Sequence, residues 1–500
     1  MPQIRFTLRE YQKNIVETAK NKNTLVVLPT GLGKTKIAIA LAIERLNKFP
    51  ESQILMCSPT RPLSNQIKNE FLDSTSIDES KIILLTGMIS PKKRTDLYKK
   101  SKIIVATPQT IAKDLENKRI NLENFSLLVL DEAHRSRMKY ANTIVTQSYM
   151  KQSQFPRILA LTASPGSTKE KINEIKENLF IEAIELRDEE SKDVKQYIQK
   201  KNIELIEVEL PKEFLEIHAL LSEVYKKRLK QLKEFGLTKP LSIINKRDLL
   251  DFQNYLFSEA KSGNRASYYG VSLTAAAIKL SHALELLETQ GLSSFSKFLK
   301  KLETETSKAS KNINQEPQTK KAKQLLEKLQ EKDLDHPKLT KLAEIIKTEL
   351  KNNINSKIII FANFRDTVKN IVKELDKIPE ASPVELIGQK EGITQKKQLE
   401  TIKQFEEGKY NIIVGTQITE EGLDLKGGLS IAIFFDQAAS AIRKIQRTGR
   451  VGRLEAGKII HLITKGTRDQ GYFWKSHKDV KKMKNIISRM KTKLDKQTTL

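Results

Sequence analysis

The stretch Leu25-Val-Val-Leu-Pro-Thr-Gly-Leu-Gly-Lys-Thr35 runs from four apolar residues into a short loop that carries two glycines and a lysine. This order predicts a buried strand, a phosphate-binding loop and the start of a helix. Gly31 and Gly33 would let backbone N–H groups approach phosphate oxygens, and the helix N-terminus would add a favourable dipole. The strict G-x-x-x-x-G-K-[ST] pattern is not met, because Leu28 stands at its first glycine. The prediction therefore depends on the flanking strand and helix.

Three further residues of this loop have the chemistry that a nucleotide site requires. Lys34 would reach the β- and γ-phosphates, and the Thr35 hydroxyl would ligate Mg²⁺. Thr30 belongs to the same loop and is expected to bind ATP with them. We therefore expect ATP and Mg²⁺ as cofactors. The alternative is a Gly-Lys turn that arose by chance.

A second segment, Asp131-Glu-Ala-His134, directly follows the apolar run 127–130. Parallel α/β sheets place their active sites at the carboxyl ends of strands, so this position favours a catalytic role. Asp131 would hold Mg²⁺, largely through water, and Glu132 would orient or deprotonate the attacking water. His134 is expected to couple two parts of the protein rather than to ligate a metal.

The third segment, Gln446-Arg-Thr-Gly-Arg-Val-Gly-Arg453, lies near the other end of the chain. Arg450 and Arg453 suit an arginine-finger role, which can accelerate phosphoryl transfer by roughly 10³–10⁵. Gln446 is expected to contact ATP as well. A basic surface turn or a phosphate-backbone contact are the alternatives. If the first interpretation holds, one ATP site is assembled from two lobes.

Short continuous apolar runs separated by helical patterns occur in two parts of the chain, and they predict two parallel-sheet α/β lobes. The run near 203–210 is a strand that could belong to the second lobe. The expected domains are lobe 1 at 1–185, lobe 2 at 186–212 plus 335–475, an all-helical insert at 213–334 and a basic helical tail at 476–500.

Apolar residues from Phe214 to Val224 recur at helical spacing in the insert, whereas the polar stretch 303–323 predicts a mobile connector. The basic segments 245–247 and 261–265 precede Tyr268 and Tyr269. Together they could grip nucleic acid, or the tyrosines could be core residues and the lysines solvated. The basic tail is likewise either a phosphate contact or a solvated face.

The chain has 500 residues, a net charge of +27 and one cysteine, Cys57. The charge favours a polyanionic partner, although a lysine-rich composition can also serve solubility. A single cysteine excludes disulfides within the chain and favours a reducing, intracellular setting, the cytoplasm or nucleoid if the cell is prokaryotic. We recognised no apolar run of membrane-spanning length and no signal peptide, so no membrane partner is expected.

Together these motifs resemble those of superfamily 2 helicases, and within them the Hef/Fanconi-anaemia M type. The segments that carry this resemblance are Leu8–Gln12, Ser58–Leu63, Ala106–Thr110, Asp131–Arg135, Leu161–Gly166, His336–Leu339, Ile387–Gln395 and Thr416–Leu425. The resemblance implies RecA-like lobes and a helical insert that grips branched DNA. It implies adenine contacts by Arg9 and Gln12, ATP contacts by Gly422 and Asp424, nucleic-acid contacts by Thr60, Arg61, Thr107 and Thr416, and coupling by Thr162 and Ser164.

The chain departs from the family pattern at Val451, where a threonine is usual, and at Lys426, where an Ile-Pro continuation is expected. The Glu-Arg-Lys-x-x-x-Asp signature of an XPF-type nuclease does not occur in the sequence. Either this is a helicase-only member, or the nuclease belongs to a part of the protein outside this sequence. A separate nuclease or clamp is therefore among the expected partners.

The resemblance implies an ATP-dependent DNA helicase or translocase of forked or branched DNA, with 3′-to-5′ polarity and a role in replication-fork repair. One alternative is a duplex-RNA-dependent ATPase of the Dicer/RIG-I-like type. Another is a DNA-binding scaffold that recruits a nuclease without unwinding DNA. Strand displacement and ATPase stimulation by different nucleic acids would separate the three.

Overall fold

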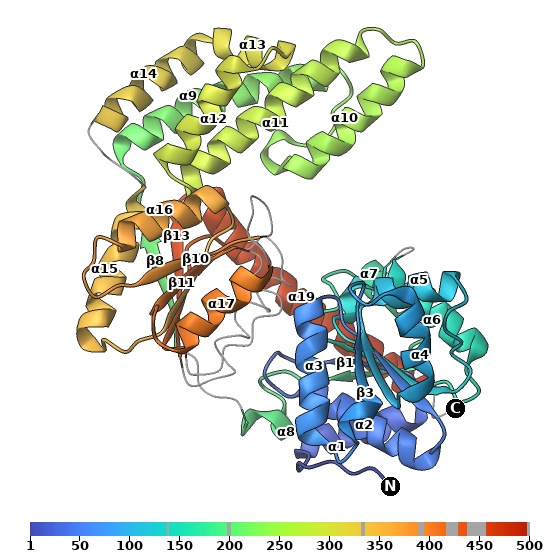
Figure 1. Cartoon of the computed structure of the whole chain (residues 1–500). Helices are drawn as coiled ribbons and strands as arrows, with labels where there is room; N and C mark the ends of the chain where they lie inside the picture. The colour runs from blue at the N-terminus through green and yellow to red at the C-terminus, as the bar shows by residue number, and fades with distance from the viewer. Residues whose placement is uncertain are drawn as a thin grey trace.

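The computed structural model describes residues 1–137, 140–197, 202–331, 336–388, 395–416, 429–437 and 457–497. They form two lobes, each built on a parallel sheet, and a separate domain of helices (Figure 1). This confirms the predicted fold class. Arg450, Arg453, Gln446, Gly422 and Asp424 lie outside the described residues.

Lobe 1 contains a seven-stranded sheet in the order β3-β4-β2-β5-β6-β1-β7, in which every pairing is parallel. The strands are β1 Thr24–Val27, β2 Gln53–Cys57, β3 Ile82–Leu85, β4 Ile103–Ala106, β5 Phe125–Leu130, β6 Ile158–Thr162 and β7 Ala183–Leu186. The connecting elements are α1 Glu10–Asn21, α2 Lys34–Lys48, α3 Arg61–Ser74, η1 Glu79–Lys81, α4 Pro91–Lys100, α5 Pro108–Glu116, η2 Ala133–Arg135, α6 Ala141–Gln152, α7 Lys169–Asn178 and α8 Lys192–Lys195.

Side chains that alternate along the lobe 1 strands pack into two apolar layers, one on each face of the sheet. One layer contains residues of α1, α2 and α3, and the other contains residues of α4, α5, α6 and α7. Because both faces are covered, the strands are continuous apolar runs rather than alternating ones.

Lobe 2 contains a six-stranded parallel sheet in the order β10-β11-β9-β12-β13-β8. Its elements are β8 Asn202–Val208, α15 Pro337–Asn352, β9 Ile358–Phe361, α16 Arg365–Leu375, β10 Pro383–Leu386, α17 Gln395–Glu406, β11 Ile412–Gly415, β12 Ile431–Phe434 and β13 Lys458–Thr464. Strand β8 precedes the helical domain in the chain and pairs with β13 over its whole length. The strand expected near 203–210 therefore does join lobe 2.

The helical domain lies between β8 and α15 in the sequence and stands apart from both sheets (Figure 1). Its elements are α9 Lys212–Lys233, η3 Leu241–Ile243, α10 Lys246–Lys261, α11 Ser267–Thr289, α12 Leu292–Thr304, α13 Lys308–Gln315 and α14 Pro317–Glu331. The prediction of a mobile connector at 303–323 was wrong. Ala309, Ile313 and Ala322 lie at most 4% exposed in the domain core, and Glu305 and Glu316 pair with Lys279 and Arg228, so this polar segment is packed in place.

Helix α11 has the length and the apolar composition of a membrane-crossing segment, although no such run was expected from the sequence. Its residues Leu273, Ala277, Leu280 and Leu287 are buried among the other helices of the domain. It is the central helix of the bundle, and this position accounts for its composition.

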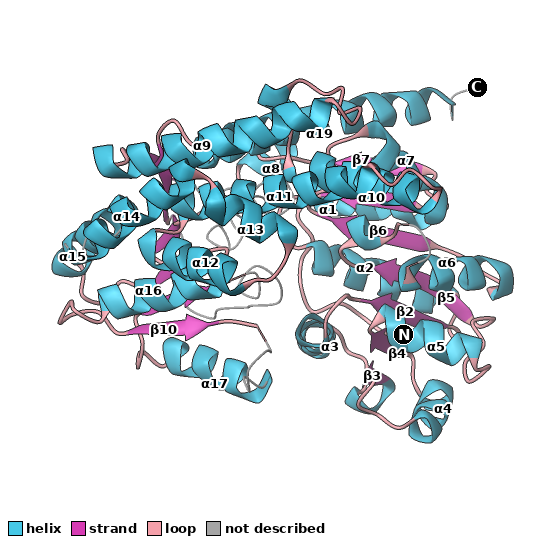
Figure 2. Cartoon of the chain, turned by 90° about the horizontal axis from the view of Figure 1, so that it is seen from above, coloured by secondary structure: helices cyan, strands magenta, loops and turns pink. Residues whose placement is uncertain are grey.

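Helix α19 Arg468–Gln497 begins on lobe 2 and runs back across the molecule to lobe 1 (Figures 1 and 2). Met483 and Ile487 are 3% and 0% exposed within the layer that also contains α4 to α7. Lys484 pairs with Asp188 at 3.0 Å and Lys491 with Glu185 at 3.1 Å. The tail is therefore not a freely solvated basic face, because its apolar side completes a core layer of lobe 1.

A buried polar network joins the helical domain to lobe 2. His336 caps α15 and is linked to the Glu288 carbonyl oxygen at 3.1 Å. Gln290 donates to Asp436 at 2.9 Å, and the Lys338 ammonium donates to the Phe435 carbonyl oxygen at 2.8 Å. The pKa of His336 falls to about 3, first because burial disfavours the charged ring and second because Lys338 lies nearby. The imidazole is therefore neutral in the folded protein.

Candidate functional site

The loop between β1 and α2 has the shape that phosphate binding requires. Gly31 and Gly33 have φ values of +87° and +71°, a left-handed conformation that glycine adopts without strain. Gly33 caps the 15-residue helix α2 with its backbone in this conformation. The first N–H groups of α2 therefore point out of the helix at the loop, where an anion is favoured.

Tyr11 and Gln12 on helix α1 hold this loop from behind. The Tyr11 hydroxyl donates to the Leu32 carbonyl oxygen at 2.8 Å, and the Gln12 amide donates to the same oxygen at 3.3 Å. Gln12 is 4% exposed and also accepts from the Arg9 backbone N–H at 2.9 Å. Gln12 thus supports the loop in this structure, and its expected adenine contact stays a prediction.

Arg9 lies over the ring of Tyr197 with its guanidinium carbon 4.6 Å from the ring centroid. Tyr197 also contacts the ring of Tyr11, with the two centroids 5.7 Å apart. A guanidinium stacked on an aromatic ring in this way is oriented before any ligand arrives. The arrangement is compatible with the predicted base contact of Arg9.

Asp131 and Glu132 follow β5 at the same edge of the sheet as the loop after β1. Every strand pairing in this sheet is parallel, so the carboxyl ends of β1 and β5 share one edge. Glu132 has a φ of +50°, which is unusual for a side chain with a Cβ. Such strain at the end of a central strand is typical of functional sites.

Glu132 contacts His134, which also contacts β6. The His134 Nδ1 atom lies 3.2 Å from a Glu132 carboxylate oxygen and 3.3 Å from the Thr162 hydroxyl. Burial raises the pKa of Glu132, but the His134 hydrogen bond and the nearby charges of His134, Lys34 and Arg135 outweigh it. The net pKa lies below the usual value, so Glu132 is ionised at neutral pH.

A continuous set of contacts extends from His134 to helix α19. The Thr162 hydroxyl accepts from the Ser164 backbone N–H at 3.1 Å. The Ser164 hydroxyl lies 2.9 Å from the Met483 sulfur on α19. The three predicted coupling residues, His134, Thr162 and Ser164, are therefore brought together, and a fourth residue extends the set toward lobe 2.

The predicted nucleic-acid contacts of lobe 1 lie at helix N-termini on this edge. Thr60 caps α3 after β2, and Thr107 caps α5 after β4. Arg61 is exposed, and the Thr60 hydroxyl has no hydrogen-bond partner among the described residues. A cavity of about 390 Å³ connects Pro59 and Pro108 with His134. Two helix N-termini beside a shared cavity suit phosphate groups of a strand.

Thr416 directly follows β11 in lobe 2, is 9% exposed and donates its backbone N–H to the Leu386 carbonyl oxygen at 3.2 Å. The predicted lobe 2 contacts with ATP are all outside the described residues. The structure therefore describes the lobe 1 half of the expected site.

ATP and Mg²⁺ fit the residues that are present. The Lys34 ammonium donates to the Leu28 carbonyl oxygen at 3.0 Å and so lies along the loop. The Thr30 hydroxyl in the loop is buried and has no hydrogen-bond partner among the described residues. Thr35 is the second residue of α2, and Asp131 supplies a carboxylate at the same sheet edge. Oxygen ligands of this kind are those that Mg²⁺ prefers.

Sequence reasoning missed Tyr11 and Met483, and it left open whether Tyr268 and Tyr269 of the helical domain are buried. Tyr11 lies inside a quoted segment but carries no motif signal of its own. Met483 belongs to an apolar series at 483, 486, 487, 490 and 494, whose helical spacing could have revealed a packed face. Tyr268 and Tyr269 are 56% and 53% exposed, so they are not core residues.

Three family models match the chain in succession. The DEAD/DEAH box helicase model matches residues 9–172 and the helicase conserved C-terminal domain model matches residues 337–455. Between them, a model described as "Putative ATP-dependent RNA helicase, helical bundle" matches residues 213–335. The matched segments correspond to lobe 1, the helical domain and lobe 2.

Solved and curated proteins are similar over nearly the whole chain. The crystal structure of the Pyrococcus furiosus Hef helicase domain is 43% identical with a TM-score of 0.74, and the similarity covers 93% of this chain and 97% of that one. A Methanocaldococcus jannaschii protein, likewise named an ATP-dependent RNA helicase, is 40% identical over 98% of this chain and 62% of its own length. The ATP-dependent DNA helicase fml1 of Schizosaccharomyces pombe is 33% identical over 97% of this chain and 60% of its own length. The chain thus spans about three fifths of these two relatives.

Proposed function

Because this chain belongs to the Hef family of ATP-hydrolysing helicases, we propose that it unwinds or translocates on forked or branched DNA with 3′-to-5′ polarity, and that it acts in replication-fork repair. One observation carries the motor part of this proposal. Glu132, at the expected hydrolysis site, is linked through His134 to Thr162 and Ser164. A change at the nucleotide therefore has a short path through packed side chains toward α19.

The residues at the carboxyl edge of the lobe 1 sheet divide the work of hydrolysis. The loop N–H groups and Lys34 hold the phosphates, and Thr35 and Asp131 hold Mg²⁺. When bound, the metal neutralises charge on the transferring phosphoryl group. Glu132, already ionised, orients or deprotonates the attacking water. Arg450 and Arg453 are proposed to complete the site from lobe 2.

A strand would lie across the helix N-termini headed by Thr60 and Thr107, with Arg61 beside it and Thr416 contributing from lobe 2. Such contacts address phosphates and not bases, so they suit a protein that steps along any sequence. Support for a branched substrate comes from the helical domain, where Tyr268 and Tyr269 are exposed beside Lys261 and Arg265. Exposed aromatic rings beside cations can stack on unpaired bases. A separate nuclease or clamp is a further proposed partner.

The test is strand displacement on forked DNA whose single-stranded arm has either a free 3′ or a free 5′ end. We expect ATP-dependent displacement from the 3′-tailed fork only, and none from the Lys34→Ala variant. DNA binding without displacement by the wild-type chain would instead favour a scaffold. Displacement from the 5′-tailed fork alone would overturn the polarity.

Duplex RNA is a second candidate substrate, because one curated relative and the helical-domain model carry RNA-helicase names. The fungal relatives that match across the chain are named DNA helicases. ATPase rates measured with single strands, forked DNA, junctions and duplex RNA at equal nucleotide concentration separate the two. A higher maximal rate with duplex RNA than with any DNA would replace the DNA proposal.

A further inference from the structure

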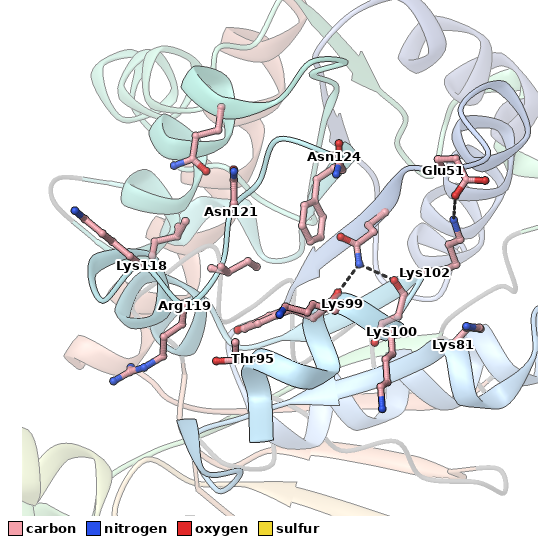
Figure 3. Close-up of a pocket in the computed structure, with 17 residues that line it drawn as sticks. Glu51, Lys81, Thr95, Lys99, Lys100, Lys102, Lys118, Arg119, Asn121 and Asn124 are labelled. Atoms are coloured by element: carbon pink, nitrogen blue, oxygen red, sulfur yellow. Dashed lines mark hydrogen bonds and ion pairs between the residues drawn. The ribbon is translucent and has the colours of Figure 1, made fainter. Parts of the chain in front are cut away.

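A cavity of about 1170 Å³ lies on lobe 1 at the amino ends of the sheet strands, whereas the ATP site lies at their carboxyl ends (Figure 3). Gln53 begins β2, Lys102 directly precedes β4, and Asn124 directly precedes β5, so the cavity is at the amino ends of these strands. The expected ATP residues follow the carboxyl ends of strands in the same parallel sheet. The cavity is therefore separate from the site described above.

The lining of this cavity is strongly cationic. It includes six cationic side chains and a single carboxylate, and we call it the basic groove: Lys81, Lys99, Lys100, Lys102, Lys118, Arg119 and Glu51. Glu51 lies 3.5 Å from Lys102, and no carboxylate among the described residues pairs with the other four lysines. Figure 3 shows Lys118 and Arg119 on one side and Lys81 and Lys102 on the other. Four ammonium groups without acidic partners around one hollow favour an anionic ligand.

The groove is held in shape by buried hydrogen bonds. Asp114 is fully buried, accepts two hydrogen bonds from Arg94 at 2.6 and 2.7 Å, and pairs with Arg119 at 3.2 Å. The Gln53 amide donates to the carbonyl oxygens of Tyr98 and Ser101, each at 2.6 Å (Figure 3). These bonds fix the ends of α4 and α5 against β2. The cations therefore project from rigid supports, which lowers the entropy lost when a ligand binds.

Lys118 occupies a backbone position that would suit glycine. Its φ is +55°, and it follows the end of α5, where its N–H donates to the Leu115 carbonyl oxygen at 3.0 Å. The Arg119 N–H donates to the Asp114 carbonyl oxygen at 2.8 Å, which completes a common helix-ending motif. Glycine usually fills this left-handed position, so the lysine stands there at a conformational cost. The strained residue contributes a cation to the groove.

Stabilisation of helix ends does not explain the whole cluster. Lys99 and Lys100 end α4, and Lys118 and Arg119 follow α5, where cations interact favourably with the helix dipole. Lys81 ends the short η1 element, and Lys102 precedes a strand. The presence of all six in the lining of one cavity therefore needs a further reason.

We propose that the basic groove binds an acidic, extended segment of a partner protein. The two aromatic rings in the lining, Tyr98 and Phe125, are 5% and 1% exposed, so neither offers a surface on which a base could stack. Asn124 and Gln152 line the same cavity and are exposed, and their side-chain N–H groups can donate to a peptide backbone, whereas the Gln152 oxygen already accepts from the Leu122 backbone N–H at 2.8 Å. Cations with amides and without exposed rings suit carboxylates on a polypeptide better than a nucleic-acid strand.

The test uses a fluorescein-labelled peptide of alternating Asp and Glu, with its Asn/Gln counterpart as a neutral probe, in fluorescence anisotropy on the full chain. The groove variant combines Lys99→Gln, Lys100→Gln and Lys118→Gly. We expect it to bind the acidic peptide about tenfold more weakly than the wild type, from three lost charge contacts. The neutral probe should bind weakly to both.

A matched control removes the same charge from the same two helices outside the groove, through Lys92→Gln, Lys93→Gln and Lys113→Gln. We expect its affinity to change less than about twofold. Equal losses in both variants would reduce the effect to net charge and overturn the proposal. If the groove variant binds single-stranded DNA about tenfold more weakly but binds the acidic peptide as the wild type does, the groove is a nucleic-acid site. That result would also overturn the proposal.

The single variant Lys118→Gly separates the loss of a groove cation from a loss of folding. Lys118→Gly alone suits its backbone position, so it should fold normally and weaken the peptide by about two- to threefold. Nucleic-acid-stimulated ATPase should be unchanged in this variant, because the groove lies at the opposite sheet edge. Unchanged peptide binding by a folded Lys118→Gly protein would contradict the role of this strained lysine.

Discussion

Shortening Ile487 to alanine should release helix α19 from lobe 1. Ile487 is fully buried in a lobe 1 core layer that includes Leu128 of β5 and Ile158 of β6. Truncating a buried isoleucine costs about 2–5 kcal/mol, because apolar burial is lost and a cavity remains. We expect a loss of about 3 kcal/mol in the free energy of docking α19 on lobe 1. This is below the upper limit because the last turns of a helix can relax around the cavity more than a central strand can. That corresponds to a rise of roughly 150-fold in the equilibrium constant for undocking.

Hydrogen exchange measures this opening directly. When reclosing is fast, the exchange rate of an amide follows the equilibrium population of the open state. Amides from 480 to 494 should therefore exchange about 100-fold faster in Ile487→Ala, whereas amides of the helical domain should be unaffected. Asn485→Ala changes an exposed residue of the same helix and serves as the control. Less than about a fivefold increase, or an equal increase in the control, would refute the docking energetics.

The functional consequence of undocking can be measured on the same variant. Met483, which lies 2.9 Å from Ser164, is one turn of helix before Ile487 and should leave with it. We expect basal ATP hydrolysis to persist and its stimulation by DNA to fall severalfold. Full stimulation from a protein whose α19 is demonstrably open would show that this contact does not couple the lobes.

Three other changes have defined outcomes. Glu132→Gln should leave ATP binding intact and slow single-turnover hydrolysis by about 10²–10⁴, and normal turnover would remove Glu132 from its assigned role. Gly33→Ala should weaken fluorescent-ATP binding at least about tenfold, because its Cβ would stand 2.6 Å from the Gln12 amide nitrogen at a φ of +71°. His336→Asn should remove an acid sensitivity of about 2 kcal/mol between pH 7 and 5. The folded pKa of His336 is depressed to about 3, so the unfolded chain takes up the proton first and stability is lost as pH falls below about 6.5. Burial raises the pKa of Asp436 to about 6, so protonation of this residue makes the folded protein more stable as the pH falls through the same range. Asp436 is present in both proteins. The difference between their urea unfolding free energies at pH 7 and pH 5, followed by Trp474 fluorescence, therefore isolates the contribution of His336.

The sequence predicted the central strands well, because strands covered on both faces must be apolar throughout. Strands β3, β7 and β10, which all lie at sheet edges, were not recognised. Strands β7 and β10 contain glutamate, at Glu185 and Glu385, which weakens the apolar signal of a short strand. Strand β3 is apolar throughout, so its composition does not explain why it was missed.

The candidate site was predictable to the extent that its residues are contiguous in motifs. The loop after β1 and the carboxylates after β5 could be assigned to one side of the sheet because all its strands were expected to be parallel. Contacts that depend on packing between distant segments could not. Examples are the support of the loop by Gln12 and the contact between Ser164 and Met483, which joins residues 319 positions apart. The polar segment 303–323 misled for a related reason, since a few apolar side chains together with ion pairs to distant residues, such as Lys279–Glu305, hold it in place.

Helix α19 also has a consequence for how the chain is made. Lobe 1 leaves the ribosome before lobe 2, but one of its apolar layers lacks Met483 and Ile487 until lobe 2 has been synthesised. During that interval the side chains of β7 that α19 will cover remain in contact with water or with a chaperone. The core of lobe 1 is then completed only when helix α19, which starts on lobe 2, docks on lobe 1. Lobe 1 therefore reaches its native stability only after lobe 2 has been made and helix α19 has docked on lobe 1.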